Sequence, residues 1–366
     1  MTVEENIKLK KEILEKMFIE SVGYKPNIDE PKTFNEKLNW LKLYYHDPRI
    51  TKYADKYEVR EYIKNTIGEE YLIPLLGVYD NAEDIDFDSL PNQFVLKVNW
   101  GSGQNIVVKD KSKLDIEDAK KKLNKWIKMT SNHYYAYYEW GYKNIKPKIL
   151  CEKFIKDDDN DNLIVYGIYC YSGKPRFIHV ITDAHTGKDR CTIYDTNWNK
   201  VDVHYIWDPI PYDVPKPKLL DKLLELANKL SCDFPHVRID FFSIGKKIYS
   251  SEITFYTNAA LSPFTPVDWD YKFGEDIIIP KDKKIEYEYI SREELIDQVT
   301  NIEKIMQEFR EINSQNNIVI KEQYIPIKKY CIFNLITLFN IDLFSINKTD
   351  KYFIITILGI KISLKL

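Results

Sequence analysis

The spacing of apolar residues changes near residue 71, and this change constrains the fold most strongly. Before that point, apolar residues recur at the three- to four-residue spacing of helices. A capping box, Thr33 to Glu36, marks the start of one of these helices. The sequence therefore predicts an N-terminal helical region, with helices at 4–20, from Thr33 to Asp47-Pro48, and at 53–65.

After residue 71, short apolar runs alternate with turn residues, as is typical of strands. Amphipathic stretches at 115–130, 216–231 and 291–312 predict helices among them. Helices followed by mixed strands and helices favour an α+β fold. The predicted strands lie at 71–80, 93–100, 104–110 and 147–155, with hairpins at 163–182 (turn 172–175) and 236–255 (turn 245–246).

The segment FVLKVNWGSGQNIVVKD, residues 94–110, places a glycine-bearing loop between two strands. It is neither a Walker A sequence nor GxGxxG, and those loops lead into a helix. Because glycine reaches positive φ easily, the backbone N–H groups around Gly101 and Gly103 could cover phosphate oxygens. Lys97 would add a point charge to the same phosphates. The alternative is a flexible hairpin with an outward-pointing lysine.

Two charged strand faces predict a metal site. Alternation places His236, Arg238 and Asp240 on one face of a strand, and Glu252 and Thr254 on one face of the next. If the strands pair about the 245–246 turn, Asp240 and Glu252 become neighbours. Two close carboxylates favour a cation such as Mg²⁺ between them, with phosphate oxygens as further ligands. The alternative is a solvated face on which Arg238 pairs with Asp240.

A third element is the strand at 149–155, where a charged pair interrupts an apolar run. Backbone groups at Glu152, Lys153, Phe154 and Ile155 could read the edge of an adenine ring. The alternative, a strand that carries Glu152 and Lys153 as a pair on the protein surface, explains the same residues equally well.

Composition excludes several classes of function. The net charge of −3 supplies no basic field for nucleic acid, so no nucleic-acid partner is expected. Five cysteines without CxxC, and a start without an apolar signal segment, predict a cytoplasmic protein with reduced thiols. The six histidines lack the spacing of zinc ligands, and no apolar run reaches 18 residues.

Taken in order, these segments resemble the ATP-grasp superfamily, and most closely the TupA-like ATP-grasp proteins of bacterial surface-polysaccharide and teichuronopeptide gene clusters. The resemblance covers about residues 30–280. The matching segments are TFNEKLNWLK (33–42), ADKYEVR (54–60), IPLLG (73–77), FVLK (94–97) with GSG (101–103), CEKFI (151–155), and VRID (237–240) with EITF (252–255).

The resemblance implies an ATP-grasp fold, in which two α+β subdomains clamp ATP, and assigns roles to residues. Lys56 and Lys97 would contact phosphates, Asp240 and Glu252 would hold Mg²⁺, and Arg238 would face the transferred phosphoryl group. The loop that closes over the phosphates comprises Gly101, Ser102, Gly103, Gln104 and Asn105, and the adenine-binding hinge comprises Glu152, Lys153, Phe154 and Ile155. The implied divisions are a helical region at 1–70, a lid subdomain at 71–150, a large subdomain at 151–290 and a C-terminal appendage at 291–366.

The sequence departs from the superfamily at one position. Many members carry Glu-x-Asn as the last metal pair, whereas this chain has Glu252-Ile-Thr254. Either Thr254 or Asn258 takes the role of the asparagine, or one Mg²⁺ alone is held tightly.

The resemblance further implies an ATP-dependent carboxylate–amine ligase acting on a uronic acid, as a sugar or a polysaccharide. His185 and Arg190 are candidates for the substrate side, and no residue identifies the base. A glycosyltransferase with a DxD metal motif within 157–161 is the main competing function, but those residues are read as a hairpin tip. An ATP-grasp sugar kinase and a non-catalytic scaffold also remain open.

The tail, 318–366, is apolar and basic, with seven lysines against three acidic residues. Its sequence pattern predicts short strands with turns at 347–350 and 359. It would be a packed β appendage or dimer contact, or would dock at the inner face of the membrane or on a pathway enzyme.

Overall fold

The computed structural model describes residues 3–129, 134, 137–157, 163–183, 189–286 and three strands beyond residue 343. The chain divides into two compact units, Met1–Val319 and Ile320–Leu366. Within the described residues, no helix combines the length and the apolar character needed to cross a membrane.

The N-terminal region is helical, as predicted, and the capping box is confirmed: Thr33 accepts from the N–H of Glu36, and Glu36 accepts from the N–H of Thr33. The predicted third helix is wrong in one respect, because it is two helices with a break at 55–58. The Asp55 carboxylate accepts from the N–H groups of Tyr57 and Glu58, which ends the first of them. The helices are α1 (Val3–Val22), α2 (Phe34–Tyr44), α3 (Pro48–Ala54) and α4 (Val59–Thr66).

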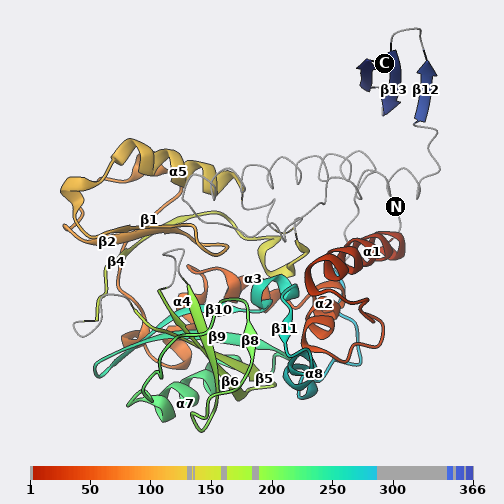
Figure 1. Ribbon diagram of the computed structural model, residues 1–366. Helices are drawn as coiled ribbons and strands as arrows, with labels where there is room; N and C mark the ends of the chain where they lie inside the picture. Colours follow the sequence, from red (N-terminus) through yellow and green to blue (C-terminus); the bar gives the residue numbers. More distant parts are fainter. Residues whose placement is uncertain are drawn as a thin grey trace. The chain divides into compact units, whose positions relative to one another are not determined.

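A four-stranded antiparallel sheet carries the glycine-rich loop, in the order β1-β4-β2-β3. Helix α5 (Ile116–Lys128) covers its outer face in Figure 1, and Leu123 packs with Phe94, Leu96 and Ile149 in the core beneath. The strands are β1 (Leu75–Tyr79), β2 (Phe94–Val98), β3 (Asn105–Val108) and β4 (Ile149–Lys153).

A five-stranded antiparallel sheet, in the order β10-β9-β5-β6-β7, forms the second layer. Helix α7 (Leu220–Ser231) lies below it in Figure 1, with Leu223, Leu226 and Leu230 buried against it. Both predicted hairpins are confirmed, since β5 pairs with β6 and β9 with β10. The strands are β5 (Val165–Tyr171), β6 (Lys174–Thr182), β7 (Arg190–Asp195), β9 (Val237–Ile244) and β10 (Lys247–Thr254).

The acidic segment 156–162 is not a hairpin tip, and that prediction is wrong. The strand before it, β4, pairs with β1 and β2, whereas the strand after it, β5, pairs with β6 and β9. The segment therefore connects the two sheets. Residues 158–162, which hold most of the DxD letters, lie outside the described residues.

Helix α2 holds the chain that follows β10. Three buried side chains on one face of α2, those of Asn35, Asn39 and Lys42, donate to the backbone carbonyls of Ser262, Ala260 and Ala259 respectively. This loop contains Asn258, Ala259 and Ala260, all at positive φ, which is strained for residues other than glycine. The remaining elements of this unit are β8 (His204–Tyr205), β11 (Phe264–Thr265), α8 (Asp268–Glu275), and 3₁₀ turns η1 (Glu69–Tyr71), η2 (Ala82–Asp84), η3 (Lys111–Lys113), η4 (Trp140–Tyr142) and η5 (Thr257–Ala260).

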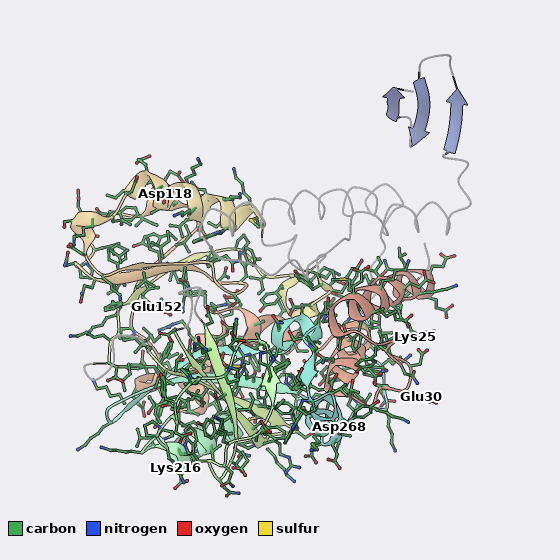
Figure 2. The ribbon with its side chains drawn as sticks, in the orientation of Figure 1. Lys25, Glu30, Asp118, Glu152, Lys216 and Asp268 are labelled. Carbon is green, nitrogen blue, oxygen red and sulfur yellow. The ribbon has the colours of Figure 1, made fainter. Side chains whose placement is uncertain are left out.

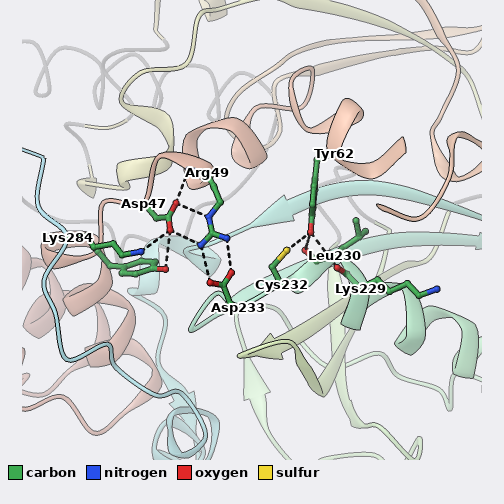
Figure 3. Close-up of polar contacts among 9 residues, drawn as sticks. Asp47, Arg49, Tyr62, Lys229, Leu230, Cys232, Asp233 and Lys284 are labelled. Atoms are coloured by element: carbon green, nitrogen blue, oxygen red, sulfur yellow. Dashed lines mark hydrogen bonds and ion pairs between the residues drawn. The ribbon is translucent and has the colours of Figure 1, made fainter. Parts of the chain in front are cut away.

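An ion-pair cluster ties the start of α3 to distant parts of the chain (Figure 3). Arg49 pairs with Asp47 and Asp233, and Lys284 pairs with Asp47. Burial alone would raise the pKa of Asp47, but hydrogen bonds from Arg49 lower it to about 2. The cluster fixes the helical region against the turn that leads into β9.

The second unit contains a three-stranded antiparallel meander, β12 (Phe344–Lys348), β13 (Tyr352–Ile357) and β14 (Ile360–Lys365). The predicted short strands of the tail are confirmed for these residues. The helix predicted at 291–312 lies outside the described residues.

Candidate active site

A cavity of about 340 Å³ opens between the glycine-rich loop and the five-stranded sheet. Its size falls within the usual range of small-molecule sites. Most of the residues selected from the sequence line it. They are Lys56, Lys97, Gly101, Ser102, Gly103, Gln104, Asn105, Glu152, Lys153, Phe154, Ile155, Arg238, Asp240 and Glu252.

On the four-stranded sheet, Lys97 does not point outward. Its Nζ lies 2.7 Å from Oε2 of Glu152, and the Lys97 side chain is 14% exposed. Figure 2 shows Glu152 on the side of this sheet that faces the rest of the unit, whereas Asp118 lies on the outer side of α5. The Glu152–Lys97 pair is therefore internal. The alternative of a surface Glu152-Lys153 pair does not hold for Glu152, whose side chain is 7% exposed, although Lys153 is exposed.

Lys56 connects the helical region to both sides of the cavity. Its Nζ donates to the carbonyl of Gly101 and lies 3.4 Å from Oε2 of Glu252. The break between α3 and α4 places it there, because the N–H of Lys56 donates to the carbonyl of Asn99 while Asn99 donates to Asp55. The start of the glycine-rich loop and the lysine are thus fixed together.

The acidic side of the cavity lies on β9 and β10. Asp240 stands opposite Glu252 and Arg238 opposite Thr254, so the pairing predicted about the 245–246 turn is confirmed. A register shift between Ser250 and Glu252 accompanies this arrangement. The two carboxylates are cross-strand neighbours on one face, where like charges repel unless cations separate them.

Arg238 and Asp240 form a bidentate ion pair, with Nε to Oδ1 at 2.6 Å and Nη2 to Oδ2 at 2.7 Å. The neighbouring position on β5 is Gly167, whose missing side chain leaves room for the pair: a Cβ there would lie 2.9 Å from Oδ1 of Asp240. The hydroxyl of Thr254 donates to Glu252 at 2.9 Å.

Burial and charge act in opposite directions on these carboxylates. Burial raises the pKa of Asp240 above its usual value. The positive charge of Arg238 lowers this pKa and the negative charge of Glu252 raises it, and the net shift is upward. Burial would also raise the pKa of Glu252, but Lys56 and Arg238 together lower it below its usual value. Glu252 therefore stays ionised, as a metal ligand must.

The comparison with family models gives one match, to the description "TupA-like ATPgrasp", over residues 36–279. The matched segment is more than half of the chain and contains every residue described above as lining the cavity. The chain belongs to the TupA-like ATP-grasp family. The fold is accordingly the ATP-grasp fold, which confirms the resemblance and the predicted fold class.

Solved structures also show similarity to this ATP-grasp chain. D-alanine–D-alanine ligase from Bacillus anthracis is 19% identical, with a TM-score of 0.32 over 56% of this chain and 57% of that one. The Helicobacter pylori enzyme is 18% identical, with a TM-score of 0.34 over 63% and 59%. A RimK domain ATP-grasp protein from Sphaerobacter thermophilus is 11% identical, with a TM-score of 0.34 over 68% and 71%.

This chain spans less than three fifths of the length of either D-alanine–D-alanine ligase. No curated protein matches it.

In this ATP-grasp chain, the carboxylates of Asp240 and Glu252 fit a magnesium ion whose other ligands are phosphate oxygens. The buried carboxylate of Asp240 and the carboxylate of Glu252, which is 20% exposed, lie on adjacent strands and face one cavity. One or two carboxylates with phosphate oxygens are the usual Mg²⁺ set. The described residues contain no group of three or more His, Cys, Asp or Glu side chains that could hold a metal without such help.

Of the substrate-side residues selected from the sequence, the three that the structure describes, Arg190, Thr254 and Asn258, do not line the cavity. Arg190 donates to the carbonyl of Pro209, and Asn258 donates to Ser262. Of the two residues that could replace the asparagine of Glu-x-Asn, Thr254 is therefore the one beside Glu252. His185 lies outside the described residues.

Several residues at the site were missed from the sequence, among them Arg60 behind Glu152, and Phe242, Asp189 and Trp207 on the cavity wall. Alternation along β9 could have found Phe242, which shares a face with Asp240. Trp207 follows a γ-turn in which its N–H donates to the carbonyl of Tyr205, with Ile206 at a φ of +70°. No sequence pattern predicts that turn.

Proposed function

We propose that the protein is an ATP-dependent carboxylate–amine ligase whose nucleotide occupies the cavity between the two sheets. One observation carries the proposal: Lys56, Lys97 and Arg238 meet the carboxylates of Asp240 and Glu252 on the wall of a single cavity beneath a glycine-rich loop. Phosphoryl transfer needs alignment and charge neutralisation more than covalent help, and these groups supply both.

Each group then has a role at a stated position. Lys56 and Lys97 bind phosphate oxygens, and backbone N–H groups of residues 101–105 cover them. Asp240 and Glu252 hold Mg²⁺, which when bound neutralises phosphate charge. The backbone of residues 152–155 contacts the adenine edge, and Arg238 orients the transferred phosphoryl group. The support is geometric, since Gly101 and Gly103 have φ of +66° and +84°, a conformation that glycine adopts without strain.

The reaction proceeds in two steps. A substrate carboxylate oxygen attacks the γ-phosphorus, the bond to the bridging oxygen of ADP breaks, and an acyl phosphate forms. An amine then attacks the acyl carbon, loses a proton, and expels inorganic phosphate to leave an amide. The glycine-rich loop excludes water, which would otherwise hydrolyse the acyl phosphate.

We further propose that the carboxylate belongs to a uronic acid, as a sugar or a polysaccharide, and that the protein works in the cytoplasm on a surface glycan. Trp207 and Asp189 support a sugar on this wall of the cavity. An aromatic face packs on the C–H groups of a pyranose, and a carboxylate accepts from its hydroxyls. The tail would form a packed β appendage or a dimer contact, or would meet the membrane surface or a pathway enzyme.

The test is ADP release in the presence of Mg²⁺ and ATP. Uronic acids are added alone, amines alone, and both together, with mass spectrometry of the products. ADP and an amide only when both are present support a ligase. ADP with the carbohydrate alone, together with a phosphorylated sugar, means a kinase. Release of a nucleoside diphosphate from a nucleotide sugar, with no use of ATP, contradicts the proposal.

A further inference from the structure

Glu152 has two cationic partners, and they differ in their access to the cavity. Lys97 Nζ lies 2.7 Å from Oε2, and Arg60 Nη1 lies 3.4 Å from Oε1. Lys97 and Glu152 line the cavity, whereas Arg60 lies outside its lining. Arg60 belongs to α4, outside both sheets, so the pair it forms joins the helical region to β4.

Arg60 is held from a second direction. Its Nη2 donates to the carbonyl of Ile73 at 2.7 Å, and its side chain is 16% exposed. A guanidinium fixed by two partners loses little further freedom when one neighbour changes. Because Arg60 lies outside the cavity lining, an occupant of the cavity does not compete directly for its two contacts.

The cost of moving Lys97 depends on this arrangement. The Glu152 side chain is 7% exposed, and a buried carboxylate left without a cation is strongly destabilised. If Lys97 were its single partner, the lysine could turn to a phosphate only by leaving such a charge behind. With Arg60 in place, Glu152 remains paired when Lys97 turns.

We propose that Arg60 is a positioning residue: it is the permanent counter-ion of Glu152 and thereby releases Lys97 to the phosphates of the nucleotide. The inference rests on the proposed nucleotide site, and it goes beyond that site by assigning a role to a residue outside the cavity wall. It requires no ligase chemistry, because it concerns binding alone.

The experiment measures the dissociation constant of Mg·ADP by calorimetry for the full chain. Arg60→Met removes the charge and keeps most of the bulk, and it is expected to weaken binding by about tenfold, since Lys97 is then held by Glu152. Adding Glu152→Gln in the same chain removes the competing carboxylate, and affinity is expected to return to within about threefold of the wild type. A merely structural role of Arg60 would give no such restoration.

Arg49→Met is the matched control. Arg49 also pairs with two carboxylates, Asp47 and Asp233 (Figure 3), but neither partner lines the cavity, whereas Glu152, the partner of Arg60, does. It is expected to lower the melting temperature without changing the affinity for Mg·ADP. If Arg60→Met does not fold, Arg60→Lys is used instead. This variant replaces the guanidinium, which contacts both Glu152 and Ile73, by a single ammonium group. The expected loss of affinity for Mg·ADP is smaller and is again reversed by Glu152→Gln.

Two results would overturn the inference: unchanged affinity in Arg60→Met, or a loss that Glu152→Gln does not reverse. Its failure is distinguishable from that of the ligase. A wild-type protein that binds Mg·ADP but forms no amide leaves the role of Arg60 intact and removes the ligase. A wild-type protein that binds no nucleotide removes both.

Discussion

Replacement of Gly167 by alanine tests whether the Arg238–Asp240 pair is held in one geometry for function. An added Cβ would lie 2.9 Å from Oδ1 of Asp240 and 3.0 Å from Cδ of Arg238. Both contacts are shorter than ordinary ones by a few tenths of an ångström. Because Oδ1 of Asp240 accepts a hydrogen bond from Nε of Arg238 at 2.6 Å, the two side chains must move together.

The expected magnitudes differ for stability and function. Overpacking by one methyl group costs about 1–3 kcal/mol of unfolding free energy. A displacement of this kind at the proposed metal ligand Asp240 and the proposed phosphoryl-orienting Arg238 is expected to lower kcat/KM for ATP by about 10- to 100-fold. Urea unfolding gives the first quantity, and initial rates of ADP release give the second.

Gly141→Ala provides the comparison for Gly167→Ala. A Cβ at Gly141 would meet Ala54 Cβ and Ile50 Cγ2, each at 3.1 Å, which is similar crowding against apolar groups that do not line the cavity. It should lower stability and leave catalytic constants near the wild type. The reasoning is refuted if Gly167→Ala keeps full activity, or if its loss of activity does not exceed that of Gly141→Ala.

Three further predictions concern metal, pH and capping. Glu252→Gln should abolish the tightening of ADP binding by Mg²⁺, measured by titration with Mg²⁺ and with EDTA; an unchanged ratio would exclude Glu252 as a ligand. Burial lowers the pKa of His236 to about 3 and that of His179 well below its usual value, so both stay neutral in the folded chain while the unfolded chain binds protons below about pH 6.5. The free energy of unfolding should therefore fall as pH drops below 6.5, by at most about 1.4 kcal/mol per pH unit for each histidine. In urea melts, His236→Asn should reduce that slope, and an unchanged slope would argue against a neutral buried His236. Thr33→Ala should cost about 1 kcal/mol through the lost cap, whereas Thr33→Ser should retain most of the stability; equal losses would contradict the capping role.

Hairpins and their faces were accessible from the sequence because their determinants are local. Turn residues at 245–246 were enough to predict the hairpin and to bring Asp240 and Glu252 near each other. Strict two-residue alternation from that turn would pair Asp240 with Ser251, and the register shift between Ser250 and Glu252 is what places Glu252 opposite Asp240. The glycine pattern at 101–103 similarly predicted a loop between paired strands, and β2 and β3 do pair.

Errors arose where contacts join segments that are distant in the sequence. The letters at 156–162 suit a tight turn, but the strands on either side belong to different sheets, and strand pairing at long range leaves no mark on the connecting residues. The apolar spacing around the end of α3 suits a continuous helix, although Asp55 ends α3 through bonds that also involve Asn99.

By itself, the sequence determined the α+β pattern, the family motifs and the hairpin that carries Asp240 and Glu252, because apolar periodicity and turn chemistry act over a few residues. Only the tertiary structure decided that Lys56 reaches Glu252, that Arg60 stands behind Glu152, and that Trp207 joins the cavity wall. Those placements depend on which helices and strands pack against one another. The partners of a buried charged residue come from distant parts of the chain that the fold brings together, and not from residues adjacent to it in the sequence.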